Sequence, residues 1–351
     1  MSSFNAGKSV VTGFPLVCVC IPTYNSAKTI RKTLTSILDQ SYPNLVIHVS
    51  DNASTDNTLR IINTIIDSRI NVHVNIENIG AEENFNRCIN LAEGKYTAIY
   101  HADDIYEFDM VERQVAYLER SSKTGAVFTA ATTIDSKDAS TGVIGWSEKP
   151  KAEFSEYDFT MLFKEILRRG NFLVCPSAMV RTHIYRDEIK RWRGDLFRSS
   201  ADLDVWLRIA KKHSVAFISK PLMRYRIDRN QFSNSVRLRT EPADLLLVLD
   251  YYLSTLDVIQ MTNAKDQRNF YRLVVNDKIW CAINQFCNGN ITTAKMLLDG
   301  VFSFDALRGS LTSRRGFLML ICSSFLYLMI AVRLKKYGPK FIISVRQIFK
   351  K

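Results

Sequence analysis

The sequence lacks the motifs of several large enzyme classes. No G-x-G-x-x-G motif follows an apolar run, so a nicotinamide dehydrogenase loses its main support. The chain has no H-E-x-x-H motif of the zinc metalloproteases. The Gly-Lys-Ser stretch at residues 7–9 has the ending of a phosphate-binding P-loop. However, Ser2 stands where the first glycine of that motif belongs, and no strand precedes it.

The cysteines also form none of the familiar patterns. The seven cysteines include no C-x-x-C pair, and an odd, scattered set is typical of a reducing compartment. Cys18 and Cys20 alternate with valine in an apolar run, so period two puts both on one face of a strand as small core residues. Residues 1–15 contain no continuous apolar segment, so we expect no secretion signal.

Acidic residues are in the minority outside the first third of the chain, and the formal net charge is +12. Residues 1–130 carry 11 Lys and Arg against 14 Asp and Glu, residues 131–240 carry 21 against 13, and the remainder carries 15 against 8. A basic surface suits nucleic acid, anionic lipid or phosphorylated substrates, or is simply solvated. Nucleic acid is disfavoured, because the basic residues are not interleaved with aromatic ones in a compact patch.

Apolar runs of strand length alternate with segments of helical periodicity through the first hundred residues. Residues 16–21 form an apolar run between two prolines, which is typical of a buried strand. This alternation predicts an α/β fold with a mostly parallel sheet and helices on both faces. The expected strands are 16–21, 45–50, 71–76 and 95–102, and the expected helices are 26–40, 54–66 (with Leu59, Ile62, Ile65 and Ile66 inward) and 80–94.

The pattern becomes mixed beyond residue 126 and helical beyond residue 241. The later elements are expected to be strands at 126–134, 172–180, 215–218 and 223–227, a helix at 202–212, and an exposed loop at 135–155. We therefore predict an α/β domain at residues 1–239 and an α-helical C-terminal region at residues 240–351.

A polar cluster directly follows each of the first four expected strands. These clusters are residues 22–25, 51–57, 77–80 and 103–104. In parallel sheets, ligands bind beyond the carboxyl ends of the strands. We therefore expect the four clusters to line one crevice.

Four stretches resemble, in order and spacing, the successive motifs of family 2 glycosyltransferases. They are VCIPTYN (19–25), VSDNASTDNT (49–58), the segment 78–104 that ends in HADD, and SADLDVWLR (200–208). The resemblance covers about residues 15–233. It implies the GT-A fold, which is a Rossmann-like sheet, a nucleotide-sugar donor, usually a divalent metal such as Mg²⁺ or Mn²⁺, and transfer with inversion.

The resemblance also implies which residues bind the nucleotide. It puts Pro22, Thr23 and Tyr24 beside the base. Asp51 and Asn52 fall where the family contacts base and ribose.

The remaining implied roles concern the metal and the proton. Asp104 falls on the metal-ligating carboxylate of a D-x-D-type motif, and Asp103 on the neighbour that contacts ribose or phosphate. Asp202 falls on the catalytic base. Two departures stand out: many members have aspartate where His101 stands and glutamate where Ala201 stands. His101 could itself ligate the metal weakly.

The chemistry of these residues supports the same roles without the resemblance. A nucleotide diphosphate and the pair Asp103–Asp104 repel one another unless a cation bridges them. A hard divalent ion held by carboxylate and phosphate oxygens does this, and it stabilises the departing diphosphate. Asp202 stands at the expected start of a helix, whose N-terminus keeps a carboxylate ionised and suits a base.

Each role has a structural alternative. Asp51 could form only a turn, Asp103 and Asp104 could cap the helix expected near residue 108, and Asp202 could be only a helix N-cap.

Two other function classes also remain open. A nucleotidyltransferase has a similar acidic metal site but usually a Gly-rich loop where this chain has Pro-Thr-Tyr-Asn. A non-catalytic nucleotide- or carbohydrate-binding protein would not require Asp202.

The C-terminal region suggests contact with a membrane. Residues 316–332 contain no charge over 17 residues, the lower limit for spanning a bilayer, and residues 340–351 form a basic amphipathic pattern. The positive-inside rule opposes a single span. We expect an in-plane or re-entrant helix at the cytoplasmic face of the inner membrane, with a buried core helix as the alternative. The resemblance implies a lipid-linked saccharide acceptor there, as in O-antigen or capsule biosynthesis.

Overall fold

The computed structural model describes residues 13–145, 153–227, 238–299, 301 and 314–331. The chain divides into two compact units. Unit 1 is Met1–Leu162, Phe172–Asp195 and Ala201–Ile227, and unit 2 is Phe163–Asn171, Leu196–Ser200 and Asp228–Lys351. The domain boundary at residue 239 remains a prediction, and the basic tail predicted at 340–351 lies outside the described residues.

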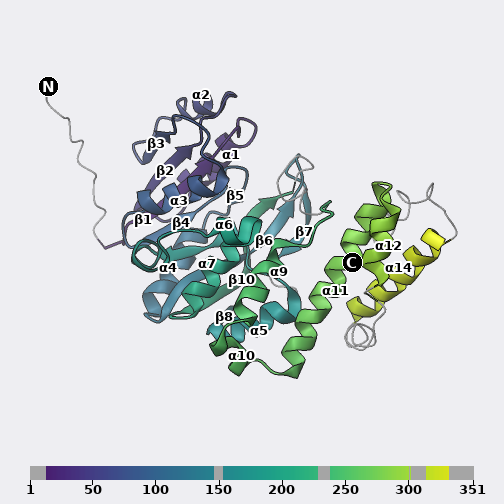
Figure 1. Cartoon of the computed structure of the whole chain (residues 1–351). Coiled ribbons are helices and arrows are strands. Elements are labelled where there is room, and N and C mark those ends of the chain that lie inside the picture. Colours follow the sequence, from purple (N-terminus) through teal and green to yellow (C-terminus); the bar gives the residue numbers. More distant parts are fainter. Residues whose placement is uncertain (1–12, 146–152, 228–237, 300, 302–313, 332–351) are drawn as a thin grey trace. The chain divides into compact units, whose positions relative to one another are not determined.

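The described part of unit 1 is built on one ten-stranded sheet (Figure 1). The strand order is β3-β2-β1-β4-β9-β6-β10-β5, with β7 paired to β6 and β8 paired to β10. The strands β1 to β4 are parallel, whereas β9 runs antiparallel to both of its neighbours. The predicted α/β fold is therefore confirmed, with a parallel first part and a mixed second part. The strands are β1 (Val17–Thr23), β2 (Leu45–Asp51), β3 (Ile70–Val74), β4 (Tyr96–Ile99), β5 (Ile105–Tyr106), β6 (Thr124–Ile134), β7 (Ser140–Ile144), β8 (Phe154–Tyr157), β9 (Met179–Arg181) and β10 (Ser214–Arg226).

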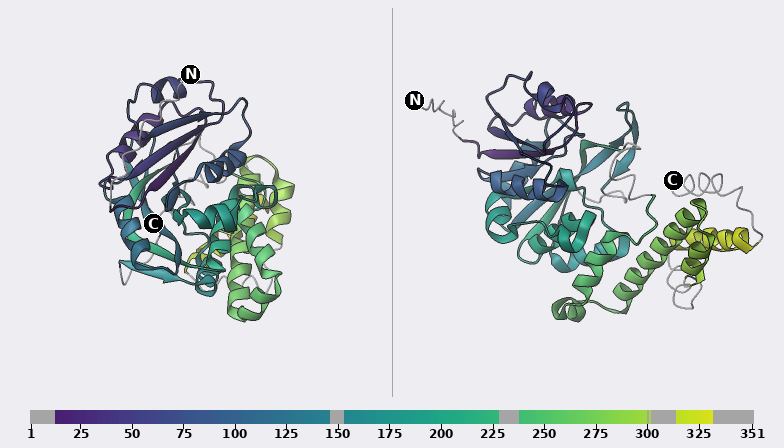
Figure 2. Two further views of the ribbon diagram at one scale, coloured as in Figure 1. Left: turned by 90° about the vertical axis from the view of Figure 1, so that its left-hand side faces the viewer. Right: turned by 45° about the horizontal axis from the view of Figure 1, so that its top comes forward.

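Helices cover both faces of this sheet. Successive side chains of a strand point to opposite faces, so the apolar side chains of β1 need a cover on each side. Val17, Val19 and Ile21 of β1 share a core with α1 and α4. On the other face, the Sγ atoms of Cys18 and Cys20 lie 3.6 Å apart, and Cys20 contacts α3. Figure 2 shows the sheet and its helices from two further sides. The helical segments are α1 (Ile30–Leu38), α2 (Thr58–Ile62), α3 (Ala81–Leu91), α4 (Met110–Arg120), α5 (Phe159–Arg169), η1 (Cys175–Ser177), η2 (Ile184–Ile189), α6 (Gly194–Phe197), η3 (Arg198–Ser200) and α7 (Ala201–Ala210).

The helix expected at 54–66 is much shorter than predicted. It is α2, which ends at Ile62, and Ile66 is 99% exposed, so the prediction that Ile66 faces inward is wrong. The Thr64 hydroxyl donates to the Ile61 carbonyl at 2.7 Å. Such local side-chain bonds compete with continuation of a helix.

Two later predictions also differ from the structure. Residues 172–180 were expected as one strand, but Pro176 lies in the turn η1 and only the short β9 follows. Proline cannot donate to a strand ladder, which explains the interruption. The two strands expected at 215–218 and 223–227 are a single strand, β10, whose register shifts around Pro221. The loop expected at 135–155 contains β7.

The described residues beyond 240 are helical, as predicted. The helices are α9 (Asp244–Leu253), α10 (Leu256–Met261), α11 (Ala264–Cys287), α12 (Ile291–Asp299) and α14 (Arg314–Ala331). Asn263 starts α11 with a capping box to Asp266. One face of α14 packs Met319, Leu326 and Met329 into a core shared with α11 and α12. Among the described residues, no helix has the length and hydropathy needed to span a bilayer.

Candidate active site

Parallel pairing brings the polar loops together at the carboxyl edge of the sheet. Thr23 at the end of β1 is in register with Asp51 at the end of β2. The Asn52 N–H continues this pairing to the Thr23 carbonyl at 2.8 Å, and the Tyr100 N–H donates to the Cys20 carbonyl at 2.9 Å. The loops after β1, β2 and β4 therefore leave the sheet side by side.

Two residues in the left-handed region shape the first two loops. Asn25 has φ 49° and Ala53 has φ 58°. Asparagine tolerates this conformation, and its side chain bonds locally. Here Asn25 Oδ1 accepts the Thr55 N–H at 2.8 Å, and its own N–H donates to Ser54 Oγ at 2.9 Å. Asn25 thus ties the loop after β1 to the loop after β2.

The residues predicted to bind the nucleotide differ in exposure. Tyr24 is 47% exposed, whereas Thr23, Asp51 and Asn52 are buried. Both Asp51 oxygens accept from Ser54, at 2.6 Å from the hydroxyl and 2.9 Å from the N–H, which is the turn foreseen as the structural alternative.

Asn52 joins the loop after β2 to the loop after β3. It donates to Asn78 at 2.9 Å and accepts from Asn75 at 2.8 Å. Pro22, which is half-buried, and Tyr24 are therefore the residues of this set most open to a ligand.

Residues 101–104 form a turn that is fixed from several sides. The Thr33 hydroxyl of α1 lies within hydrogen-bond distance of the Ala102 and Asp104 carbonyls, at 3.0 and 2.7 Å. The His101 N–H donates to the Tyr106 hydroxyl at 2.8 Å, and the Tyr106 ring stacks on Tyr100 with centroids 3.9 Å apart. The backbone of this turn is held in place before any ligand arrives.

Asp104 is 1% exposed and only half satisfied. Its Oδ1 accepts the Arg226 N–H at 2.8 Å, while its Oδ2 is buried without a hydrogen-bond partner. The Arg226 side chain is used elsewhere: it donates to the Asp103 and Asp135 carbonyls at 2.8 Å each and pairs with Asp138 at 2.6 Å. Burial, and next the charge of Asp103, raise the pKa of Asp104 well above its usual value.

The turn offers a set of atoms that fits a divalent cation. One ligand atom each from His101, Asp103 and Asp104 lies within 4.8 Å of the others. Burial lowers the pKa of His101, which keeps its imidazole neutral at neutral pH. Carboxylate oxygens suit Mg²⁺ and Mn²⁺, and a neutral imidazole suits transition metals. The unpaired Asp104 Oδ2 is the observation that a cation would explain.

Asp202 lies in the first turn of α7. Its Oδ1 accepts the Leu203 N–H at 2.7 Å. Burial raises the pKa of Asp202 to about 6, against the lowering effect of backbone N–H groups from Leu203 and from Asp202 itself. The helix N-terminus was expected to keep this carboxyl ionised. Burial raises its pKa more than the backbone N–H groups lower it, but at about 6 the carboxyl is still ionised at neutral pH.

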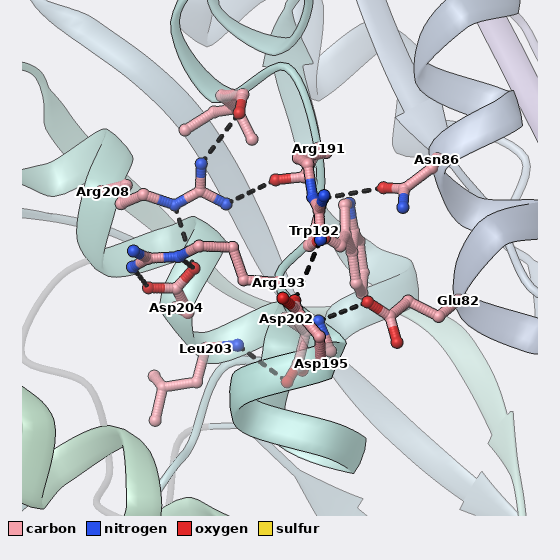
Figure 3. A network of polar contacts seen from close by, with 12 residues as sticks. Glu82, Asn86, Arg191, Trp192, Arg193, Asp195, Asp202, Leu203, Asp204 and Arg208 are labelled. Carbon is pink, nitrogen blue, oxygen red and sulfur yellow. Dashed lines mark hydrogen bonds and ion pairs between the residues drawn. The ribbon is translucent and has the colours of Figure 1, made fainter.

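Asp204, two residues further on, has a different environment (Figure 3). It is 0% exposed and lies between two guanidinium groups: Arg193 Nε donates at 3.0 Å and Arg208 Nε at 2.9 Å. Arg208 also donates to the Arg191 and Ile189 carbonyls at 2.7 and 2.8 Å. Asp204 therefore serves to hold the segment 189–193 against α7.

The same segment is attached to α3. The Trp192 N–H donates to Asn86 Oδ1 at 2.7 Å, and the Gly194 N–H donates to Glu82 (Figure 3). A Cβ atom on Gly194 would overlap the Glu82 carboxylate in its present position. These bonds attach residues 192–194 to α3.

Comparisons with known proteins agree with this geometry. The model of the family described as Glycosyl transferase family 2 matches residues 18–188. An uncharacterized glycosyltransferase of Methanocaldococcus jannaschii is 31% identical over 231 residues, which are 64% of this chain and 75% of that protein. The chain belongs to glycosyltransferase family 2.

Other relatives have more specific names. A putative teichuronic acid biosynthesis glycosyltransferase, TuaG of Bacillus subtilis, is 28% identical to this glycosyltransferase, covering 63% of this chain and 82% of the relative. The Escherichia coli UDP-Glc:alpha-D-GlcNAc-diphosphoundecaprenol beta-1,3-glucosyltransferase WfaP is 38% identical over 104 residues, 30% of this chain and 41% of that one. Among solved structures, the mannosyltransferase PcManGT from Pyrobaculum calidifontis, in complex with GDP-Man and Mn²⁺, has a TM-score of 0.53 at 18% identity, covering 95% and 87% of the two chains. This likeness confirms the predicted GT-A fold.

Two further residues near the candidate site of this glycosyltransferase were not singled out from the sequence. Burial raises the pKa of Tyr225 far above its usual range, and the nearby Asp104, Asp103, Cys175 and Asp202 add to the effect. Burial likewise raises the pKa of Cys175, with contributions from Asp202 and Asp104. Tyr225 and Cys175 are therefore close enough to Asp104 and Asp202 to feel both charges. Strand alternation could not predict which way these two side chains point, because the register of β10 shifts and Pro176 lies in a turn.

Proposed function

We propose that this glycosyltransferase moves a sugar from a nucleotide-diphospho-sugar to a hydroxyl of a saccharide acceptor, with inversion at the anomeric carbon. The observation that carries the proposal is the converging set of ligand atoms of His101, Asp103 and Asp104, in which the buried Oδ2 of Asp104 has no hydrogen-bond partner. Asp202 in the first turn of α7 supplies a separate carboxylate for the proton. Direct displacement needs a base on one side of the sugar and a diphosphate site on the other. A binding protein would not require such a base, and a nucleotidyltransferase usually has a Gly-rich loop where this chain has Pro-Thr-Tyr-Asn.

Asp202 is the proposed base that takes the proton of the acceptor hydroxyl. A general base works best when its pKa lies near the working pH, and burial brings the pKa of Asp202 to about 6. At neutral pH it is ionised yet more basic than an exposed carboxylate. Asp204 is not a substitute, because Arg193 and Arg208 occupy its carboxylate.

Asp104 is the proposed ligand of a divalent cation, Mg²⁺ or Mn²⁺. When bound, the cation neutralises the donor diphosphate and stabilises it as a leaving group. Asp103, whose carboxylate lies in the same cluster, is the proposed contact to the ribose or phosphate. The Arg226 guanidinium holds the carbonyls of Asp103 and Asp135, so it fixes the turn instead of replacing the cation.

The nucleotide is proposed to lie over the loops after β1 and β2. Tyr24 is exposed and offers an aromatic face to the base, with Pro22 beside it. The buried side chains of Thr23, Asp51 and Asn52 maintain the loop conformation on which the base and ribose rest.

We propose that the acceptor is lipid-linked and that the pathway builds a bacterial surface polysaccharide. The support is the names of two relatives, one for teichuronic acid biosynthesis and one for a diphosphoundecaprenol-linked substrate. A second support is α14, whose outward face is apolar: Phe317, Ile321, Phe325 and Leu328 are 49%, 50%, 49% and 59% exposed. Its other face is packed against α11 and α12, as in the buried-core alternative considered for residues 316–332. A helix with an exposed apolar face, next to basic residues, suits an anionic membrane surface on the cytoplasmic side.

The reaction is tested by incubating the protein with a panel of nucleotide-sugars and measuring released nucleoside diphosphate, with Mn²⁺ or with EDTA. We expect release from one donor, dependent on the metal and increased by a polyprenyl-diphosphate saccharide. Release of pyrophosphate from a nucleoside triphosphate would favour the nucleotidyltransferase. Donor binding without turnover under any condition would favour a binding protein.

Membrane contact is tested by flotation with phosphatidylglycerol vesicles. Ile321→Glu places a charge on the exposed face of α14 and should lower the bound fraction. Met296→Glu is the matched control, because Met296 is 70% exposed on α12. If Ile321→Glu leaves flotation unchanged but lowers the oligomeric state, the apolar face binds a second copy of the chain and the membrane proposal is wrong.

A further inference from the structure

The metal turn differs from an all-carboxylate site by one residue. His101 stands at its first position, and its Nδ1 lies 3.9 Å from Asp104 Oδ2. Within the described ranges, His101, Asp103 and Asp104 are the one group of three or more His, Cys, Asp or Glu residues whose ligand atoms converge closely enough for an ion.

Two atoms of this group are buried without a hydrogen-bond partner. They are Nε2 of His101 and Oδ2 of Asp104, and Asp104 as a whole is 1% exposed. A buried polar atom without a partner is destabilising, so folded proteins rarely retain one unless something binds there. The unpaired Oδ2 of Asp104, with the imidazole Nδ1 of His101 3.9 Å away, indicates a ligand that both residues share.

The imidazole is held in a fixed orientation. Its ring meets Phe85 of α3 edge to face at 5.7 Å, and Phe85 in turn packs on Trp192 at 4.7 Å. The backbone of His101 is fixed by the Tyr106 hydroxyl. A ligand on a rigid support binds its ion in one geometry and therefore selects among ions.

We propose that His101 is a direct nitrogen ligand of the cation that Asp104 binds, and that it makes this site prefer Mn²⁺ over Mg²⁺. Mg²⁺ demands oxygen ligands, whereas imidazole nitrogen binds first-row transition metals. An aspartate at this position would give an all-oxygen site that accepts both ions. This inference rests on the proposed function, because it assigns a ligand and a selectivity to the same metal site.

The test uses full-length wild-type protein loaded with Mn²⁺ and UDP or GDP. Electron spin-echo envelope modulation detects a nitrogen nucleus bound directly to Mn²⁺, and histidine labelled with ¹⁵N assigns the signal. We expect a directly coupled histidine nitrogen in the wild type and in His183→Asp, a matched change at an exposed histidine. The signal should be lost in His101→Asp.

Selectivity is measured separately, from the affinities of Mn²⁺ and Mg²⁺ in the presence of the nucleoside diphosphate. In His101→Asp the preference for Mn²⁺ should fall about tenfold, which corresponds to about 1.4 kcal/mol. Bound Mn²⁺ without histidine coupling in the wild type overturns the inference and leaves the proposed function intact. Transfer that is insensitive to EDTA, in a protein that binds no Mn²⁺, removes the metal from the proposed function and this inference with it.

Discussion

Asp104 in the metal turn and Asp204 in α7 are buried to the same extent, but the chain treats them differently. Asp104 is 1% exposed and Asp204 is 0% exposed. Asp204 receives two guanidinium groups from within the chain, whereas Asp104 receives one backbone N–H and keeps a bare oxygen. A buried charge needs a partner. The chain supplies that partner for Asp204, whereas the proposed partner of Asp104 is a cation.

This comparison separates a structural carboxylate from a functional one. Removing a structural carboxylate should damage stability first, and removing a functional one should damage activity first. Asp202 is a third case: its side chain is partly buried, accepts one backbone N–H and has a raised pKa. The substitutions below test whether the three carboxylates fall into these classes.

The largest effect is expected for Asp104→Ala. Transfer should fall below detection, and Mn²⁺-dependent binding of UDP or GDP should be lost. Folded stability should not fall, because the variant removes a buried carboxylate that is only half satisfied. Turnover and calorimetric nucleotide binding check the first expectation, and urea unfolding checks the second.

Glu107→Gln is the control for Asp104→Ala. It removes a nearby carboxylate that is paired with Arg224 at 2.8 Å on the surface. It should keep its metal-dependent binding. If Asp104→Ala binds the nucleoside diphosphate with unchanged metal dependence, Asp104 is not the metal ligand.

The reverse pattern is expected for Asp204→Ala. The free energy of unfolding should fall by about 3 kcal/mol or more, because two arginines lose their shared buried partner. Urea denaturation measures this loss. Asp195→Ala removes an exposed partner of Arg191 and should change stability by less than about 0.5 kcal/mol. Equal stability of Asp204→Ala and wild type would remove the distinction between the two buried aspartates.

An intermediate effect is expected for Asp202→Asn. The amide keeps the shape and removes the basicity, so turnover should fall by about 10² or more while donor affinity hardly changes. Asp195→Asn is the control for a carboxylate-to-amide change nearby. Turnover above about a tenth of wild type would show that another group accepts the proton.

Much of the fold could be predicted from sequence because local pattern and tertiary structure agree in its first hundred residues. Val17, Val19 and Ile21 lie on one side of β1. The apolar residues of the helices that cover them repeat with helical spacing. The sequence pattern and the structure disagree where a single residue interrupts a strand or a helix. Pro176 ends a strand, and Thr64 ends a helix by bonding to the preceding turn.

The candidate site was predictable in its loops but not in its partners. The positions of Asp103, Asp104 and Asp202 follow from motifs, because strand ends and helix starts are local features. The two arginines around Asp204 and the bare oxygen of Asp104 depend on contacts between segments far apart in sequence, such as Asp104 with Arg226. The raised pKa values of Asp202 and Tyr225 cannot be predicted from a sequence pattern, because both result from burial in the folded protein.

The smallest effect is the dependence on pH that Asp202 confers. Its pKa is about 6 in the folded protein and 3.8 in the absence of burial. The base must be ionised, so kcat/KM should fall as the pH drops through about 6, and this acid limb should disappear from the residual activity of Asp202→Asn. Stability should show the opposite sign. A carboxyl with a raised folded pKa favours the folded state below pH 3.8, and this advantage is lost as the pH rises through about 6. Asp202→Asn should therefore gain stability relative to wild type between about pH 3.5 and about pH 8 in urea unfolding. If the stability difference between Asp202→Asn and wild type is the same at both pH values, burial does not raise the pKa of Asp202. Asp202 would then behave as an exposed carboxylate, unlike Asp104.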